Sequence, residues 1–170
     1  FSPSSTTAAS LIISQSASAG VKYPIMAGDT WENSAIIDAA KGTNITVALS
    51  TFFDENDDGA TAAEFVNGFK EWLNSDKQNL TNNGGNDIVA AVSALGFDAY
   101  NVAIEAIKAA NSKDSDAVAK ALPGVNYEGV TGLIKFNATG DAEKDMAYIK
   151  TVDTTNGVFK FVKTQSVKEM

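Results

Sequence analysis

Apolar and polar positions follow two different periods along the first third of the chain. Residues 4–20 begin with hydroxyl side chains suited to a helix cap and end in a glycine. A second helix is expected through Ala40, with Asn33 or Ser34 as its cap and Gly42 ending it. Residues 21–27 are expected to form a short strand, and the run 45–52 is rich in β-branched residues, as buried strands are. Helices that alternate with buried strands predict an α/β fold built on a parallel sheet.

Two amphipathic patterns occupy the middle of the chain. The segment 61–74 opens with Thr61-Ala-Ala-Glu64, the spacing of a capping box, and its apolar residues then recur at helical spacing. The polar stretch 75–85 is expected to be a loop, and a long helix is expected from about residue 87 to 110. The apolar stripe of this long helix should face a sheet or another helix, and it consists of Ile88, Val92, Leu95, Ala99, Val102, Ala106 and Ala110.

The last third of the chain has a different pattern. A short helix is expected over residues 116–122, closed by Pro123-Gly124. Three apolar runs, 133–136, 146–152 and 158–162, are then separated by turns containing Gly, Asp and Asn. Such runs predict strands joined by tight turns, so the chain should end in an antiparallel ribbon.

One acidic loop, with the sequence DENDDG, begins like the calcium-binding loop of an EF-hand. Its first, third and fifth positions carry oxygen-bearing side chains, namely Asp54, Asn56 and Asp58, and glycine follows. Position 12 holds Phe65 in place of the bidentate Glu, and Glu64 comes one residue early. The preceding segment is a predicted strand, whereas an EF-hand loop follows a helix. We therefore expect a solvated loop that ends in the capping box, and no metal site.

The composition excludes most catalytic chemistry. The sequence contains no His, Cys or Arg, so it has no imidazole base, no thiolate, no disulfide and none of the usual zinc ligands except carboxylates. Asp29 and Glu32 form a carboxylate pair in sequence, but nothing nearby supplies a nucleophile or an oxyanion hole. We expect neither enzymatic activity nor a cofactor. The net charge of −8 and the scattered lysines also argue against nucleic acid as a partner.

The apolar runs and the first residue bear on cellular location. No run approaches the roughly 20 residues that a membrane-spanning helix requires. Phe1 opens the sequence without the basic and apolar regions of a signal peptide. We therefore expect the chain to be cut from a longer one, and the cysteine count leaves its compartment open.

Four stretches resemble the later half of the type I periplasmic binding proteins, the branched-chain amino-acid-binding receptors of ABC transporters. They occur in the order found in that family and together cover nearly the whole chain. The last of them combines an aromatic residue, the sequence Gly-Val-Thr-Gly, an apolar strand and a Gly-Asp turn. The stretches are Leu11–Ser16 with Gly20, Pro24–Trp31, Ala94–Ile107 and Tyr127–Asp141.

The resemblance implies a two-lobe α/β receptor of which this chain is roughly the C-terminal half. Its fold would be a parallel sheet flanked by helices, followed by the antiparallel ribbon. Three segments are expected within it: a ligand-lobe segment (1–57), a helical crossover segment (58–125) and a strand-rich return segment (126–170).

The same resemblance implies a function. It points to the substrate-binding component of an ABC importer, which captures an amino acid of the branched-chain type, or a similar small solute, when its lobes close. The partners would be that solute and the ABC permease, and the location would be extracellular, periplasmic or, as a lipoprotein, on the cell surface. A ligand-sensing or cell-surface interaction module of the same fold stays open as an alternative.

Two residues of the Pro24–Trp31 stretch are candidates for the ligand site. Asp29 follows a predicted strand, at the place where open α/β sheets bind ligands. In the family an acidic residue here accepts the ammonium group of the ligand, and the alternative role is that of a plain turn cap. Trp31 either walls the pocket or packs on a neighbouring helix.

Three hydroxyl residues at the start of the first predicted helix complete the candidate site. Ser4, Ser5 and Thr6 match the region that borders the ligand in the family, and each is also suited to capping the helix. The glycines at 129 and 132, next to Tyr127, suit a tight chain crossing and are expected to be structural.

Overall fold

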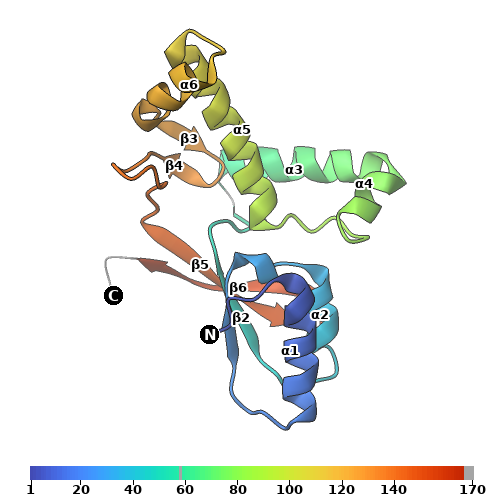
Figure 1. Cartoon of the computed structure of the whole chain (residues 1–170). Coiled ribbons are helices and arrows are strands. Elements are labelled where there is room, and N and C mark those ends of the chain that lie inside the picture. The colour runs from blue at the N-terminus through green and yellow to red at the C-terminus, as the bar shows by residue number, and fades with distance from the viewer. Residues whose placement is uncertain (58, 167–170) are drawn as a thin grey trace.

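The computed structural model describes residues 1–57 and 59–166, which fold into two lobes stacked one above the other (Figure 1). We call them the lower lobe and the upper lobe, and the chain crosses between them after Thr51 and again before Met146. The lower lobe contains α1 (Thr6–Ser18), β1 (Ile25–Ala27), η1 (Asp29–Trp31), α2 (Ser34–Ala40), β2 (Val47–Thr51), β5 (Met146–Asp153) and β6 (Val158–Ser166). The upper lobe contains α3 (Ala60–Ser75), α4 (Lys77–Asn82), α5 (Ala91–Ala110), α6 (Ser115–Ala121), η2 (Leu122–Gly124), β3 (Tyr127–Gly129) and β4 (Gly132–Ile134).

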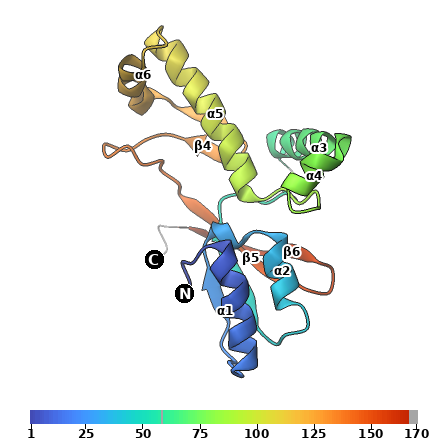
Figure 2. The same ribbon diagram turned by 45° about the vertical axis from the view of Figure 1, so that its right-hand side comes forward.

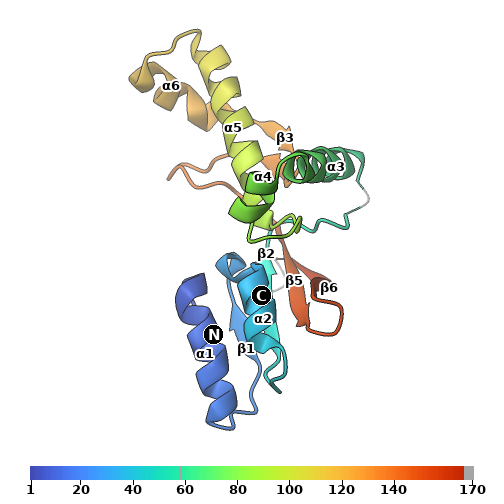
Figure 3. The ribbon, with the colours of Figure 1, turned by 90° about the vertical axis from the view of Figure 1, so that its right-hand side faces the viewer.

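The lower lobe is built on a four-stranded sheet with the order β1-β2-β5-β6. The strands β1 and β2 are parallel, and the antiparallel pair β5–β6 joins the sheet because β5 runs antiparallel to β2. Helices α1 and α2 cover one face, and their apolar residues share a core with β2 and Phe159 (Figure 3). The predicted α/β class is confirmed, and so is the antiparallel pairing of the runs 146–152 and 158–162. The run 133–136 does not join them, because β4 pairs with β3 in the upper lobe. The sheet is mixed because β5 adds to it antiparallel to β2.

The upper lobe is organised around α5. This helix begins at Ala91, four residues after the expected start, and its buried stripe is Ala91, Ala94, Asp98, Val102 and Ala106. The predicted stripe is therefore right only in its last turns, since Val92 is 50% exposed. Small alanines allow close packing of α5, and hydrogen bonds satisfy the buried Asp98, so hydropathy alone selects the wrong face at the start of the helix.

The predicted capping box at Thr61 is wrong. Helix α3 begins at Ala60 after Gly59, and no side chain caps it. Thr61 therefore lies inside the first turn, where its hydroxyl cannot act as the cap. The chain turns one residue early because the carboxylate of Asp57 accepts a hydrogen bond from Gly59 N–H at 2.8 Å.

The polar stretch predicted as a loop contains a short helix. Helix α4 forms because the carboxylate of Asp76 accepts a hydrogen bond from Gln78 N–H at 2.7 Å, which is an N-cap bond.

Along α3, the rings of Phe65, Phe69 and Trp72 follow one another at centroid distances of 5.6 Å. Within the described ranges, none of the helices has the length and apolarity needed to cross a membrane.

Two carboxylates of the acidic loop after β2, Asp54 and Asp57, accept hydrogen bonds from other groups of the protein. Asp54 accepts hydrogen bonds from the backbone and side-chain nitrogens of Asn56, at 3.0 and 3.1 Å, and Asp57 accepts one from Tyr148 Oη at 3.2 Å. Asp58 lies outside the described residues. Among residues 1–57 and 59–166, no group of three or more acidic side chains is arranged to hold a metal ion.

Calcium should therefore not stabilise this protein. Without a calcium site, millimolar calcium should leave the melting temperature within about 1 °C of the value in chelator. A ligand at a hundredfold excess over its Kd would instead add about 2.7 kcal/mol to the free energy of unfolding. A thermal melt in the presence of calcium, with magnesium as the control, makes the measurement. A calcium-specific rise of more than about 5 °C would contradict the loop interpretation.

Candidate functional site

The edge of the lower sheet that faces the upper lobe is where the chain places its candidate residues. The carboxyl ends of the parallel strands β1 and β2 lie at this edge, the usual ligand side of an open α/β sheet. Ser2 extends the parallel arrangement, because it pairs with Ala27 and its N–H donates to Met26 O at 2.8 Å. The residues after Ser2 and those after Ala27 consequently lie side by side.

Hydrogen bonds tie these two segments together. The carbonyl oxygen of Ser4 accepts from Trp31 Nε1 at 2.9 Å and from Thr30 Oγ1 at 3.4 Å. Thr6 Oγ1 donates in return to Thr30 O at 2.6 Å. The structure therefore brings the start of α1 against the turn Gly28–Trp31, which we call the edge turn.

The edge turn presents Asp29 at its start. Asp29 opens η1 and is partly exposed, and its backbone oxygen accepts from Glu32 N–H at 2.9 Å. Ser5 stands at the N-cap position of α1, is exposed, and makes no side-chain cap bond. The hydroxyl of Ser5 and the carboxylate of Asp29 are thus not used to cap α1 or η1, and their role in binding a ligand stays a prediction.

Trp31 is placed differently from the other candidates. Its side chain is 0% exposed and belongs to the core formed by α1, α2 and β2. The indole supports the edge turn from inside the lobe, and its hydrogen bond to Ser4 O fixes the start of α1. This corresponds to the packing interpretation of Trp31, and the proposed pocket wall stays a prediction.

A buried ion pair next to the edge turn was missed by sequence reasoning. Glu32 and Lys150 are both buried, and Lys150 Nζ donates to Glu32 Oε1 at 2.5 Å. Asp54 lies 3.8 Å from the same ammonium group. The one signal in the sequence is a lysine within the apolar strand 146–152, because a buried ammonium requires a carboxylate partner.

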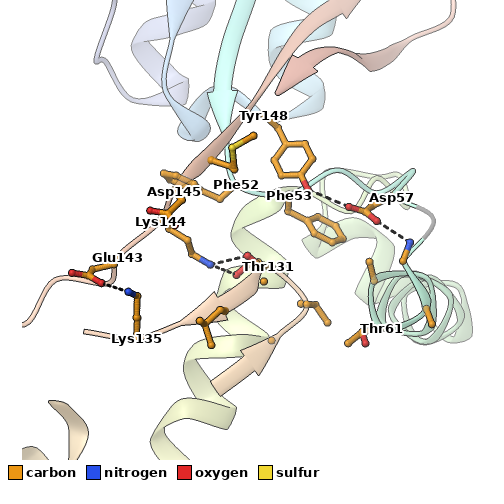
Figure 4. Close-up of a pocket in the computed structure, with 18 residues that line it drawn as sticks. Phe52, Phe53, Asp57, Thr61, Thr131, Lys135, Glu143, Lys144, Asp145 and Tyr148 are labelled. Carbon is orange, nitrogen blue, oxygen red and sulfur yellow. Dashed lines mark hydrogen bonds and ion pairs between the residues drawn. The ribbon is translucent and has the colours of Figure 1, made fainter. Parts of the chain in front are cut away.

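A cavity of about 450 Å³ opens between the lobes beside the two crossing segments (Figure 4). Its lower wall comes from the ends of β2 and β5, with Phe52, Phe53 and Tyr148. Its upper wall comes from the first turn of α3 and from the turn between β3 and β4. Residues 143–146 of the return crossing form its side, so the cavity lies where movement of one lobe against the other changes its shape.

The lysines that line this cavity bond to other groups of the protein. Lys144 Nζ donates to Thr131 O at 2.7 Å and to Thr131 Oγ1 at 2.8 Å, and Lys135 pairs with Glu143 at 2.7 Å. Burial lowers the pKa of Lys144, while the nearby carboxylate of Asp98 acts in the opposite direction. Burial also raises the pKa of Tyr148, as does the charge of Asp57. The contacts of Lys144 and Tyr148 join the crossing segments to the upper lobe and stabilise the junction.

Asp98 organises the turn that forms the upper wall. Its carboxylate accepts hydrogen bonds from Val130 N–H, Thr131 N–H and Thr131 Oγ1 at 2.9, 2.8 and 2.7 Å. A side chain at Gly129 would place its Cβ 2.5 Å from that carboxylate, and Gly132 has φ +84°. The turn therefore needs a glycine at both positions, which confirms their expected structural role.

Comparison with known proteins identifies what this architecture is similar to. Residues 4–156 match the family described as periplasmic binding protein. A comparison with curated proteins found no match. A solved leucine binding protein from Thermotoga maritima is 25% identical with a TM-score of 0.79, and the alignment covers 99% of this chain and 44% of that one.

Two further solved structures share the fold at lower identity. A branched-chain amino acid transporter substrate binding protein from Streptococcus pneumoniae, in complex with isoleucine, is 22% identical with a TM-score of 0.71, covering 97% of this chain and 43% of that one. A solute binding protein of an ABC transporter from R. palustris, in complex with benzoate, is 14% identical with a TM-score of 0.71, covering 96% and 41%. The chain thus spans less than half the length of these proteins.

Proposed function

Because the chain belongs to the periplasmic binding protein family, we propose that it forms part of the extracellular substrate-binding component of an ABC importer. The observation that carries the proposal is the family match over residues 4–156, since this range includes both crossing segments and elements of both lobes. The solute we propose is an amino acid of the branched-chain type. Two of the similar structures support this choice, one named a leucine binding protein and the other containing isoleucine.

The proposed mechanism is capture by lobe closure without a chemical step. The edge turn supplies a carboxylate, Asp29, that is suited to accept hydrogen bonds from an ammonium group. The solute would lie between this edge and the upper lobe, and rotation of the lobes about the crossing segments would enclose it. The cavity beside those segments supports such a motion, because its walls belong to different lobes.

The proposal includes a location and a partner. A receptor of this kind acts outside the cytoplasm, in the periplasm or, as a lipoprotein, on the cell surface, and it delivers its solute to an ABC permease. The family membership supports this placement. A ligand-sensing or surface interaction role would share the same binding step and differ only in the partner.

Isothermal titration calorimetry with the twenty amino acids tests the proposal directly. The intact gene product that contains this chain should bind leucine, isoleucine or valine with a stoichiometry of about one, and the melting temperature should rise with ligand concentration. Benzoate serves as a control for an acid without an ammonium group. Binding of benzoate but of no amino acid would contradict the proposed solute, and binding of neither would contradict solute capture.

A further inference from the structure

The carboxylate of Glu32 lies where three segments meet. It directly follows the edge turn, and its Oε1 accepts from Lys150 Nζ in β5 at 2.5 Å. Its Oε2 accepts from the backbone N–H of Ala91 at 2.7 Å. Ala91 is the first residue of α5, the helix whose lower end lies next to the lower lobe in Figure 2. One side chain therefore joins the edge turn, the lower sheet and the central helix of the upper lobe.

This hydrogen bond replaces a cap that α5 lacks. The residue at the N-cap position is Ala90, which has no side-chain oxygen, and the helix start is buried. An uncapped, buried helix N-terminus leaves amide donors without acceptors, and a carboxylate is the preferred partner there because it also complements the helix dipole. The lower lobe therefore supplies, through Glu32, an acceptor that the upper lobe does not supply to Ala91.

The lysine holds this carboxylate in place. Lys150 is 2% exposed, and its ammonium group also lies 3.8 Å from Asp54 on the first crossing segment. Thr51 Oγ1, at the end of β2, donates to Glu32 Oε2 at 3.4 Å. A side chain held from several sides has little freedom to rotate, so a displacement of the edge turn moves the acceptor relative to α5.

We propose that Glu32 is a positioning residue that couples the edge turn to the upper lobe, so that a solute bound at this turn changes the angle at which the lobes meet. The inference rests on the proposed function for the identity of the solute, but the coupling itself concerns this chain alone. Glu32 does not contact the solute. It acts through the hydrogen bond to Ala91, and the ion pair with Lys150 sets the orientation of the carboxylate that accepts this bond.

Two double variants separate coupling from stability. Glu32→Met with Lys150→Met removes both charges and leaves Ala91 N–H without its acceptor, whereas Glu32→Gln with Lys150→Met removes both charges and keeps an amide oxygen for that N–H. Replacing a buried ion pair by residues of similar volume is often neutral for folding. The two variants differ only at residue 32, so they differ in the proposed link.

The readout is the distance between the lobes. This chain contributes no cysteine, so Gln15→Cys and Ala109→Cys, both exposed, accept a pair of spin labels once any cysteine elsewhere in the intact protein has been replaced by serine. Without solute, we expect a broader distance distribution in the Glu32→Met double variant than in the parent, and an unchanged one in the Glu32→Gln double variant. With the amino acid identified by calorimetry, the first should bind at least tenfold more weakly, and the second within threefold of the parent.

The outcomes distinguish the two proposals. Equal distance distributions and equal affinities in the two double variants would overturn the coupling role and leave Glu32 as a purely structural residue. Failure of the parent to bind any amino acid would count against the proposed function, while the solute-free distances would still decide the coupling.

A backbone variant covers the case in which the Glu32→Met double variant does not fold. Ala91→Pro removes the same N–H at the first position of a helix, where proline is tolerated. Ser115→Pro, at the first position of α6, is the matched control. Only Ala91→Pro should broaden the interlobe distance, and equal distributions in both proline variants would overturn the proposal.

Discussion

Asp29→Asn should weaken binding of the amino acid by about 30-fold to several-thousand-fold, measured by calorimetry on the intact protein. Asparagine keeps the shape of the side chain and an acceptor oxygen, but it loses the charge that pairs with an ammonium group. Removing one partner of such a desolvated pair costs about 2–5 kcal/mol in binding free energy. The position of Asp29, partly exposed at the start of the edge turn, leaves its carboxylate accessible to a solute.

The same substitution should barely change folding. We expect the free energy of unfolding without solute to change by less than about 1 kcal/mol, because Asp and Asn serve equally well in turns. Asp38→Asn, on the exposed surface of α2, is the matched control and should change neither quantity. If the Asp29→Asn variant binds as tightly as the parent, or unfolds well before it, Asp29 is a turn residue and the anchor lies elsewhere.

Asp98→Ala should be one of the most destabilising single substitutions in the chain. Three donors of the β3–β4 turn lose a buried carboxylate acceptor. Hydrogen bonds to charged groups contribute roughly 1.5–3 kcal/mol each, and relaxation of the turn recovers part of the loss, so we expect a cost of about 3–5 kcal/mol. The upper wall of the interlobe cavity should lose its shape at the same time.

Chemical denaturation with the parent, Asp98→Ala and Glu71→Ala provides the measurement. Glu71 is an exposed carboxylate in the middle of α3, so its removal should change the free energy of unfolding by less than about 0.5 kcal/mol. A loss below about 1 kcal/mol in Asp98→Ala would mean that water replaces the carboxylate at the turn, and that the Asp98 hydrogen bonds do not determine the structure of this wall.

Local sequence patterns determined the elements of the lower lobe. The sequence predicted the helices α1 and α2, the strands β1 and β2 and the final pair β5–β6, because each pattern reports interactions between residues close in sequence. Asn33 caps α2 through a 2.9 Å bond from Ala35 N–H, as its position at the start of the second predicted helix indicated. The family resemblance also came from local stretches, and residues 4–156 match that family.

The burial of polar groups follows from contacts between segments that are distant in the sequence. Glu32 and Lys150 are separated by more than a hundred residues, and the pairing of β5 with β2 brings them to one place. Asp98 interrupts an otherwise apolar stripe, and the turn that satisfies it lies on a different element. A sequence pattern records the hydropathy of a residue but not the donors that will surround it. It therefore does not predict that these carboxylates are buried.

The same distinction between local patterns and tertiary contacts applies to the candidate site. The sequence pattern predicts hydroxyl side chains at the start of the first helix and an acidic side chain, Asp29, after a strand. Only the folded molecule shows that the starts of α1 and of the edge turn lie side by side and that Trp31 is buried beneath them. Helix and strand patterns depend on neighbours in the chain, whereas burial and ion pairing depend on contacts that form only when the two lobes and the ribbon come together.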